Sequence, residues 1–206
     1  TPSLGEYSTI AKRAKGSTLP RPRRALERVH LDIVFGDGLG RMGYRYALLL
    51  VDRATRFIWV FGLKSLHADA FISAFKQFRA EAGGLAVQFR TDCDAKLLSH
   101  AVVDWLRSNG SDIASAPAGR QSSNGLVERH WRTLVEMARS YLTEKQMPRA
   151  YWLSAIQHSA RMMNCIPGKI NDELTTPFEL IHHSPPNSCL WFPLFSVGYF
   201  HHTRDG

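Results

Sequence analysis

Three apolar segments near the start of the chain limit its fold most strongly. They cover residues 28–36, 44–52 and 57–65, and only short turns separate them. Their β-branched and aromatic side chains and their length are typical of β-strands. Because strands joined by short turns pair antiparallel, the chain should open with a three-stranded antiparallel sheet.

Helix and strand patterns alternate after these segments. The sequence predicts a helix at 66–84, a strand at 85–92, a helix at 93–110, a short strand at 111–117 and helices at 122–142 and 147–168. Strands that are separated by helices add to a sheet in parallel. We therefore predict an α/β fold, with a five-stranded mixed sheet and helices on both of its faces.

The segment 122–142 has the clearest helical periodicity. Its apolar stripe consists of Val127, Trp131, Leu134, Val135, Ala138 and Leu142. Ser123 or Asn124 can cap the helix. Glu128 lies in the first turn, where the helix dipole favours an acid. Glu128 is therefore either an ordinary helix-start residue or a carboxylate at the mouth of a site.

Two aspartates accompany the predicted strands. Asp32 lies in the middle of the first strand, and Asp92 ends the fourth. An aspartate inside an apolar strand is costly unless its charge is compensated, so Asp32 is either bonded to backbone or a metal ligand. Sites in α/β sheets gather where strand ends meet helix starts, and Asp32, Asp92 and Glu128 can converge there.

Converging carboxylates repel one another unless cations neutralise them. Mg²⁺ prefers carboxylate oxygen and water as ligands. Two such ions at one site are a common means of phosphoryl transfer on nucleic acids. Two Mg²⁺ ions could therefore neutralise a cluster of Asp32, Asp92 and Glu128.

The net charge indicates which kind of partner the protein binds, and the cysteine content indicates the cellular compartment. The 206 residues carry a net charge of +8. Residues 1–29 hold seven basic and two acidic side chains, so this arm either contacts phosphates or is a solvated linker. The three widely spaced cysteines favour a reducing compartment, nuclear and cytoplasmic. No apolar run approaches the ~18 residues of a membrane span.

Several sequence motifs resemble one known family. Asp92 and Glu128 are separated by 35 residues, a spacing found in retroviral and retrotransposon integrases. HLDIVFGD, YALLLVDRATRFIWVFGLKS, RTD and SAPAGRQSSNGLVERHWRTL strengthen the match. The tail TTPFELIHHSPPNSCLWFPLFSVGYFHH is similar to the segment that follows copia-type cores. Over residues 26–203 the chain resembles a copia-type (Pseudoviridae-like) integrase core.

The resemblance implies a ribonuclease H-like integrase core. Such enzymes trim the 3′ ends of element DNA and join them to target DNA, with Asp32, Asp92 and Glu128 as catalytic residues that bind two Mg²⁺ (or Mn²⁺) ions. It implies element-end and target double-stranded DNA as partners, a homo-multimer on that DNA and no membrane. The expected domains are a basic N-terminal segment at 1–25, the catalytic core at 26–168 and a C-terminal extension at 169–206.

Residues beside Glu128 are candidates for DNA contacts. Gln121, Ser122, Ser123 and Asn124 form a polar loop before the helix, where the alternative is loop flexibility. Arg129 and Arg132 flank Glu128, and we favour phosphate contact over a solvated helix face. Trp105, Trp131 and Trp152 lie on helical faces and are predicted to pack in the core.

The chain departs from the family pattern in two places. Asp92 is followed by Cys93, Asp94, Ala95, Lys96 and Leu97, where the family has Asn, two glycines, Glu and an aromatic residue. Ser8 and Ala11 stand where two zinc-binding cysteines are expected. An inactive nucleic-acid-binding module and a ribonuclease H-like nuclease are therefore the alternatives to an integrase.

Overall fold

The computed structural model describes residues 22–36, 38–92, 96–115, 125–187 and 194–195. In chain order its elements are β1 (Arg28–Phe35), η1 (Arg41–Gly43), β2 (Tyr46–Asp52), β3 (Ile58–Leu63), α2 (Ala68–Ala82), β4 (Gln88–Thr91), α3 (His100–Ser108), β5 (Asp112–Ser115), α4 (Gly125–Glu144), η2 (Arg149–Tyr151), α5 (Trp152–Cys165), β6 (Gly168–Ile170), β7 (Glu173–Thr175) and α6 (Pro177–His182). None of the helices in these ranges is long and apolar enough to cross a membrane.

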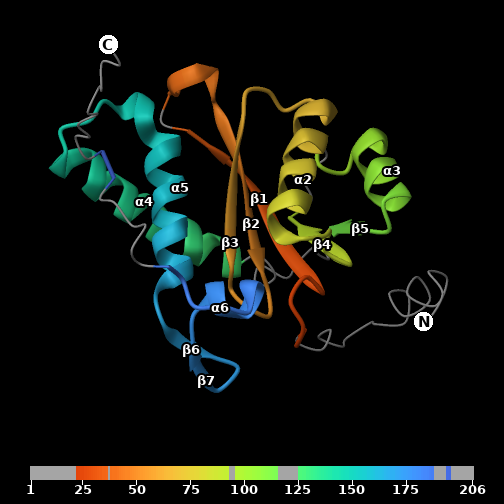
Figure 1. Cartoon of the computed structure of the whole chain (residues 1–206). Coiled ribbons are helices and arrows are strands. Elements are labelled where there is room, and N and C mark those ends of the chain that lie inside the picture. Colours follow the sequence, from red (N-terminus) through yellow and green to blue (C-terminus); the bar gives the residue numbers. More distant parts are fainter. Residues whose placement is uncertain (1–21, 37, 93–95, 116–124, 188–193, 196–206) are drawn as a thin grey trace, which may run out of the picture.

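The main sheet has the predicted mixed topology. Its five strands lie in the order β3-β2-β1-β4-β5. The pairs β1–β2 and β2–β3 are antiparallel, whereas β1–β4 and β4–β5 are parallel. Figure 1 shows α2 and α3 on one side of this sheet and α4 and α5 on the other. The prediction of a five-stranded mixed sheet with helices on both faces is confirmed.

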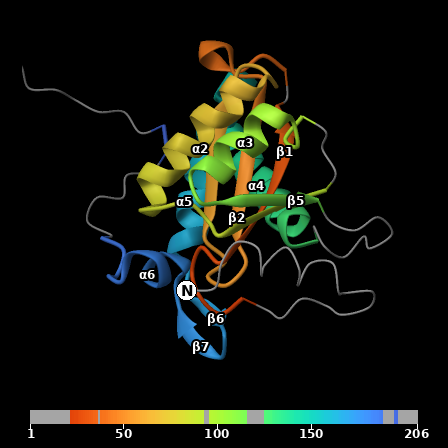
Figure 2. The ribbon, with the colours of Figure 1, turned by 90° about the vertical axis from the view of Figure 1, so that its right-hand side faces the viewer.

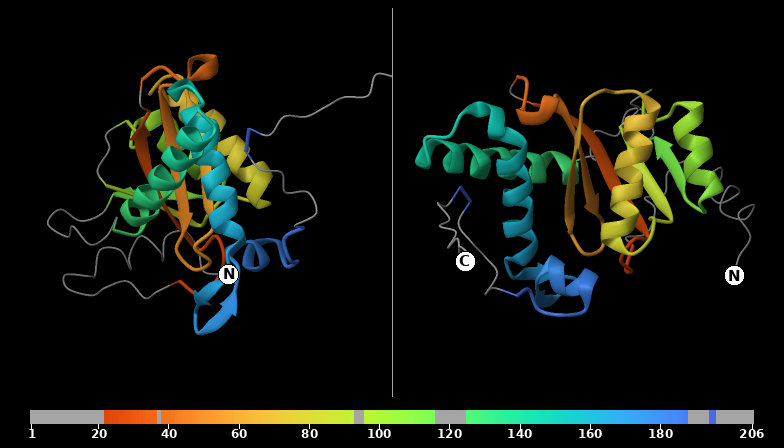
Figure 3. Two further views of the ribbon diagram at one scale, coloured as in Figure 1. Left: turned by 90° about the vertical axis from the view of Figure 1, so that its left-hand side faces the viewer. Right: turned by 45° about the horizontal axis from the view of Figure 1, so that its top comes forward.

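Strict alternation along the strands builds two hydrophobic cores. Val29, Leu31 and Ile33 of β1 pack with the buried residues of α2 and α3. Val34 of the same strand packs on the opposite side, with α4 and α5. Successive strand residues point to opposite faces, so one strand supplies both cores. Views from the two sides show α2 and α3 over one face (Figure 2) and α4 and α5 over the other (Figure 3).

The helix predicted for residues 93–110 is shorter in the structure. Residues 96–98 form a turn, and α3 begins only at His100. Leu97 is fully buried in the core under α2 and α3. Ser99 has an extended backbone, with φ −61° and ψ 145°, at the N-cap position. The extended backbone of Ser99 ends the turn and precedes the first helical residue, although the Ser99 hydroxyl makes no capping hydrogen bond.

The start of α5 rests on glycines of the sheet. A Cβ at Gly36 would overlap the indole ring of Trp152, and one at Gly62 would overlap the Leu153 side chain. Trp152 and Leu153 are both buried in the core beside α4. The absence of side chains at these two glycines therefore lets α5 approach the sheet closely.

The outer edge of β3 is covered by amide side chains of α5. Asn164 Oδ1 accepts a hydrogen bond from the Ile58 N–H at 2.8 Å, and Asn164 Nδ2 donates to the Ile58 carbonyl at 2.8 Å. Gln157 Nε2 donates to the Val60 carbonyl at 3.1 Å. These bonds satisfy backbone groups that an edge strand otherwise leaves open to pairing with another chain.

Asp52 ties the segment before β1 to the turn after β2. Its carboxylate accepts hydrogen bonds from the N–H groups of Leu26 (2.9 Å), Ala54 (3.0 Å) and Thr55 (2.7 Å) and from the Thr55 hydroxyl (2.9 Å). Burial raises the pKa of Asp52, and the hydrogen bonds from Thr55, Leu26 and Ala54 oppose that shift.

Three short elements follow α5 and were not predicted. Strands β6 and β7 form an antiparallel hairpin, and α6 follows directly. Thr176 begins α6 with a capping box, in which its hydroxyl accepts from Glu179 N at 3.0 Å and Glu179 Oε2 accepts from Thr176 N at 2.9 Å. The predicted boundaries at residues 25 and 168 stay predictions.

We expect Gly36→Ala to destabilise the protein by about 1–3 kcal/mol, since the added methyl group must displace the Trp152 ring from a packed core. Urea unfolding of both proteins measures this. Gly84→Ala is the matched control, because a Cβ at Gly84 meets no atom within 4 Å. Equal losses in the two variants would contradict the close packing of α5.

Asp52→Ala should cost about 3 kcal/mol of unfolding free energy, because buried N–H groups lose their acceptor. Asp104→Ala, at an exposed position of α3, should change stability little. Thermal and urea unfolding of the two variants provide the comparison. A small effect of Asp52→Ala would mean that water replaces the carboxylate.

Candidate active site

Asp32 lies on the face of β1 that α4 and α5 cover. Asp32 and Val34 are two residues apart and therefore point to the same face of the strand, where Val34 packs in the core beside these helices. Asp32 is half-buried, and its Oδ1 accepts a hydrogen bond from the Ile33 N–H at 2.9 Å. The backbone bond expected for a structural aspartate is thus present, and it still leaves carboxylate lone pairs for other partners.

Asp92 follows β4 directly and is exposed. The parallel register pairs His30 of β1 with Arg90 of β4. This pairing ends at Arg90, and Asp92 lies one residue beyond the end of β4. Phe89 packs in the core under α2 and α3, so alternation directs Arg90 to the α4 side. Strand pairing therefore makes the strand that carries Asp32 and the strand that precedes Asp92 neighbours in the sheet.

Glu128 lies in the first turn of α4, as predicted. Leu126 and Val127 are buried in the core and fix this turn against the sheet. The Glu128 side chain itself is exposed. The described residues include no group of three or more His, Cys, Asp or Glu that could hold a metal ion. Asp32, Asp92 and Glu128 thus do not form a closed ligand set in this conformation.

The surroundings of the two aspartates are strongly basic. Arg28 Nε donates to Gln88 Oε1 at 3.1 Å, which joins β1 to β4. Burial lowers the pKa of Arg28, and the positive charge of Arg90 lowers it further. The Nε of Arg90 is buried and has no hydrogen-bond partner in the described part of the chain. Cations therefore accumulate on the side of the sheet that carries the acids.

His130 adds to this arrangement from the second turn of α4. Its Nδ1 donates to the Leu126 carbonyl, with the two atoms 2.7 Å apart. Burial lowers the pKa of His130, as do the positive charges of Arg56 and Arg129, against the opposing effect of the Leu126 bond. The ring is thus held neutral beside a cationic surface. Sequence reasoning missed Arg90 and His130, although each lies two residues from a predicted acid.

The predicted DNA-contacting residues fall into two groups. Arg129 and Arg132 lie on α4 and are exposed, where they can reach a phosphate. Gln121, Ser122, Ser123 and Asn124 lie outside the described residues, as do Cys93, Asp94, Ser8 and Ala11. The roles assigned to them from the sequence stay predictions.

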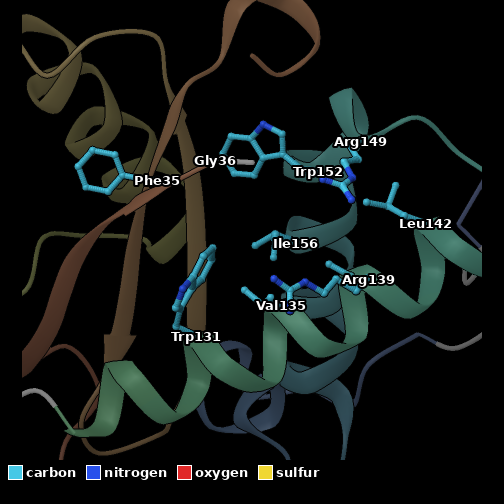
Figure 4. Close-up of a pocket in the computed structure, with 10 residues that line it drawn as sticks. Phe35, Gly36, Trp131, Val135, Arg139, Leu142, Arg149, Trp152 and Ile156 are labelled. Carbon is cyan, nitrogen blue, oxygen red and sulfur yellow. The ribbon is translucent and has the colours of Figure 1, made fainter. Parts of the chain in front are cut away.

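A cavity of about 300 Å³ opens between α4, α5 and the end of β1. Figure 4 shows Trp131, Val135 and Arg139 on α4 and Trp152 and Ile156 on α5 around it. Trp152 is buried, as predicted, whereas Trp131 is half-buried and forms part of the cavity wall. Trp131 lies one helical turn beyond Glu128, so this cavity begins beside the candidate site.

No protein-family model matches the sequence. The chain is similar to Pol polyproteins of transposons. It is 30% identical over 147 residues, 66% of its length, to the retrovirus-related Pol polyprotein from transposon TNT 1-94 of Nicotiana tabacum. It is 29% identical over 171 residues, 80% of its length, to that from transposon RE2 of Arabidopsis thaliana. The chain spans 11% of the length of each of these relatives.

Solved structures with a similar fold are retroviral integrases. The catalytic core domain of HTLV-2 integrase in complex with magnesium, in its trimeric form, matches 78% of this chain and 97% of that chain, with a TM-score of 0.59 and 20% identity. The catalytic core domain of BIV integrase matches 76% and 94%, with a TM-score of 0.60 and 14% identity.

A larger assembly shows the same core. A chain of the simian T-cell lymphotropic virus intasome, solved with the PP2A regulatory subunit B56 gamma, matches 90% of this chain and 63% of that chain, with a TM-score of 0.66 and 16% identity. The sequence relatives and the shared architecture agree with each other. The chain is a copia-type Pol relative whose described core has the ribonuclease H-like fold of retroviral integrase catalytic cores.

Proposed function

We propose that this chain is an integrase core that trims 3′ ends of DNA and joins them to a target strand, with Asp32, Asp92 and Glu128 as its catalytic residues. The observation that supports the proposal is the parallel pairing of β1, which carries Asp32, with β4, which Asp92 follows directly. Glu128 begins the helix that crosses this face. The transposon relatives support a role in DNA integration.

The donor set fits a hard divalent ion. All three side chains offer carboxylate oxygens, which suit Mg²⁺ or Mn²⁺ and do not suit a soft metal. The magnesium complex of the HTLV-2 core supports the same choice. Two ions held by these residues would activate water or a 3′-hydroxyl and stabilise the leaving oxygen.

The chain's own residues differ in how firmly they are held. Asp32 is held by the antiparallel pairing of β1 with β2, in which it lies opposite Leu49. The Glu128 carboxylate is exposed, and no described residue hydrogen-bonds it. Its side chain can therefore turn toward the aspartates once a cation offsets their mutual repulsion.

Arg129 and Arg132 would bind DNA phosphates beside this site. Arginine suits this role because its planar guanidinium binds phosphate oxygens in pairs. Gln121, Ser122, Ser123 and Asn124 and the basic segment 1–25 would extend the contact. The trimeric core and the intasome among the structural neighbours support a homo-multimer on double-stranded DNA. We place this activity in the nucleus and cytoplasm.

A second candidate function is DNA binding without catalysis. The open ligand set favours it, since no metal-holding group of acids occurs among the described residues. The exposed Lys96 adds a positive charge four residues after Asp92. An inactive module should show no stabilisation by Mg²⁺, whereas an integrase or a nuclease should. The DNA products then distinguish an integrase from a nuclease, because an integrase joins DNA ends to a target and a nuclease only cuts DNA.

We expect Glu128→Gln to reduce strand transfer in Mg²⁺ by at least about a hundredfold, because metal-ion catalysis contributes several kcal/mol to such reactions. A gel assay of labelled DNA ends joined to a target measures this. Glu136→Gln, at an exposed position on the same helix, is the matched control. Full activity of Glu128→Gln would disprove the metal assignment, and inactivity of the unaltered chain would favour the DNA-binding module.

We also expect Arg132→Ala to weaken DNA binding and to lower the slope of log affinity against log salt by about one, because one phosphate contact is lost. Fluorescence anisotropy with a labelled duplex at several salt concentrations gives both quantities. Lys76→Ala removes the same charge from an exposed position on α2, at the other face of the sheet. An equal change in both variants would assign the effect to net charge alone.

A further inference from the structure

Two adjoining cavities form a groove between the second half of α4 and the start of α5. The first, of about 300 Å³, is lined by Phe35, Gly36, Trp131, Val135, Ala138, Arg139, Leu142, Arg149, Trp152 and Ile156. The second, of about 640 Å³, is lined by Arg139, Leu142, Thr143, Gln146, Met147 and Arg149. Because Arg139, Leu142 and Arg149 border both cavities, we treat them as one α4–α5 groove.

The first cavity of the α4–α5 groove has mainly apolar walls. They are the rings of Trp131 and Trp152 and the aliphatic side chains of Val135, Leu142 and Ile156 (Figure 4). Its polar groups are Arg139, Arg149 and the buried Nε1 of Trp152, which has no hydrogen-bond partner in the described part of the chain. All of these groups are hydrogen-bond donors. An apolar side chain can therefore fill the space between the rings while acceptor groups beside it meet the donors.

The rim of the groove is positively charged. Arg139 and Arg149 are both exposed at the boundary between the two cavities. Arg41 donates a hydrogen bond from its guanidinium to the Tyr151 hydroxyl at 2.7 Å, and its guanidinium carbon lies 5.1 Å from the centre of that ring. None of the described residues that line either cavity is acidic. Carboxylates are therefore the groups that this rim complements.

We propose that the α4–α5 groove binds a short acidic segment of a partner protein, which inserts one aromatic or branched aliphatic side chain into the first cavity. Arg139 and Arg149 pair with carboxylates on both sides of the inserted side chain. The polar walls of the second cavity, Thr143 and Gln146, face the rest of the segment. A buried apolar anchor inside a charged rim is the usual arrangement of a strong interface contact. This role goes beyond DNA joining and uses none of the three acids.

The test uses the full chain and a labelled synthetic peptide with a phenylalanine–leucine pair flanked by aspartates and glutamates. Fluorescence anisotropy should show saturable binding, and the emission of Trp131 and Trp152 should change with the same midpoint. Replacing the apolar pair by serines, or the acids by lysines, should each weaken binding at least tenfold. Arg139→Glu in the protein should do the same.

Lys76→Glu is the matched protein control, because it makes the same charge change on α2 and should leave binding unchanged. Leu142→Ser tests the apolar wall, and circular dichroism confirms that each variant is folded. The proposal is overturned if the acidic peptide does not bind, or if Lys76→Glu weakens binding as much as Arg139→Glu. The proposal is also overturned if a DNA oligonucleotide binds through Arg139 more tightly than the peptide does. It is overturned as well if the peptide binds only after residues 196–206 have been deleted from the protein.

Discussion

The arrangement of the main sheet depends on the double pairing of β1. This strand bonds to β2 in antiparallel and to β4 in parallel, and its side chains supply both hydrophobic cores. A strand held on both edges and both faces has little freedom, so Asp32 has a fixed position. The parallel pairing makes β4 the neighbour of β1, and Asp92 follows directly after β4. The strands that bring these two acids into one part of the sheet are distant in sequence.

The third acid and the α4–α5 groove depend on a different contact, the approach of α5 to the sheet. Gly36 and Gly62 leave room for Trp152 and Leu153, while Asn164 and Gln157 bond to the edge of β3. Helix α4 packs against α5 and contacts β1 and β2. Since α4 is long and its apolar stripe is continuous, its first half carries Glu128 over the sheet while its second half forms the groove wall. One helix therefore links the proposed catalytic and partner sites.

The sequence was sufficient for the parts that follow from periodicity. Short apolar segments between turns and helices identified all five main strands, and the apolar stripe identified α4, because both patterns arise from burial. Periodicity could not show where α3 begins, since Leu97 is buried in a turn just as it would be in a helix. It also missed β6, β7 and α6, which are too short to show a period. The basic cluster of Arg28 and Arg90 requires the register of β1 and β4, which no local pattern contains.

The negative charge of the predicted acids would affect the order in which a metal ion and DNA bind. Carboxylates that gather at one site would repel phosphate as well as each other. A divalent ion at the aspartates would remove the repulsion and allow Glu128 to approach. DNA held by Arg129 and Arg132 would then meet a neutralised site. This order makes metal binding a condition for productive DNA binding, whereas the α4–α5 groove needs no metal because it attracts its anionic partner directly.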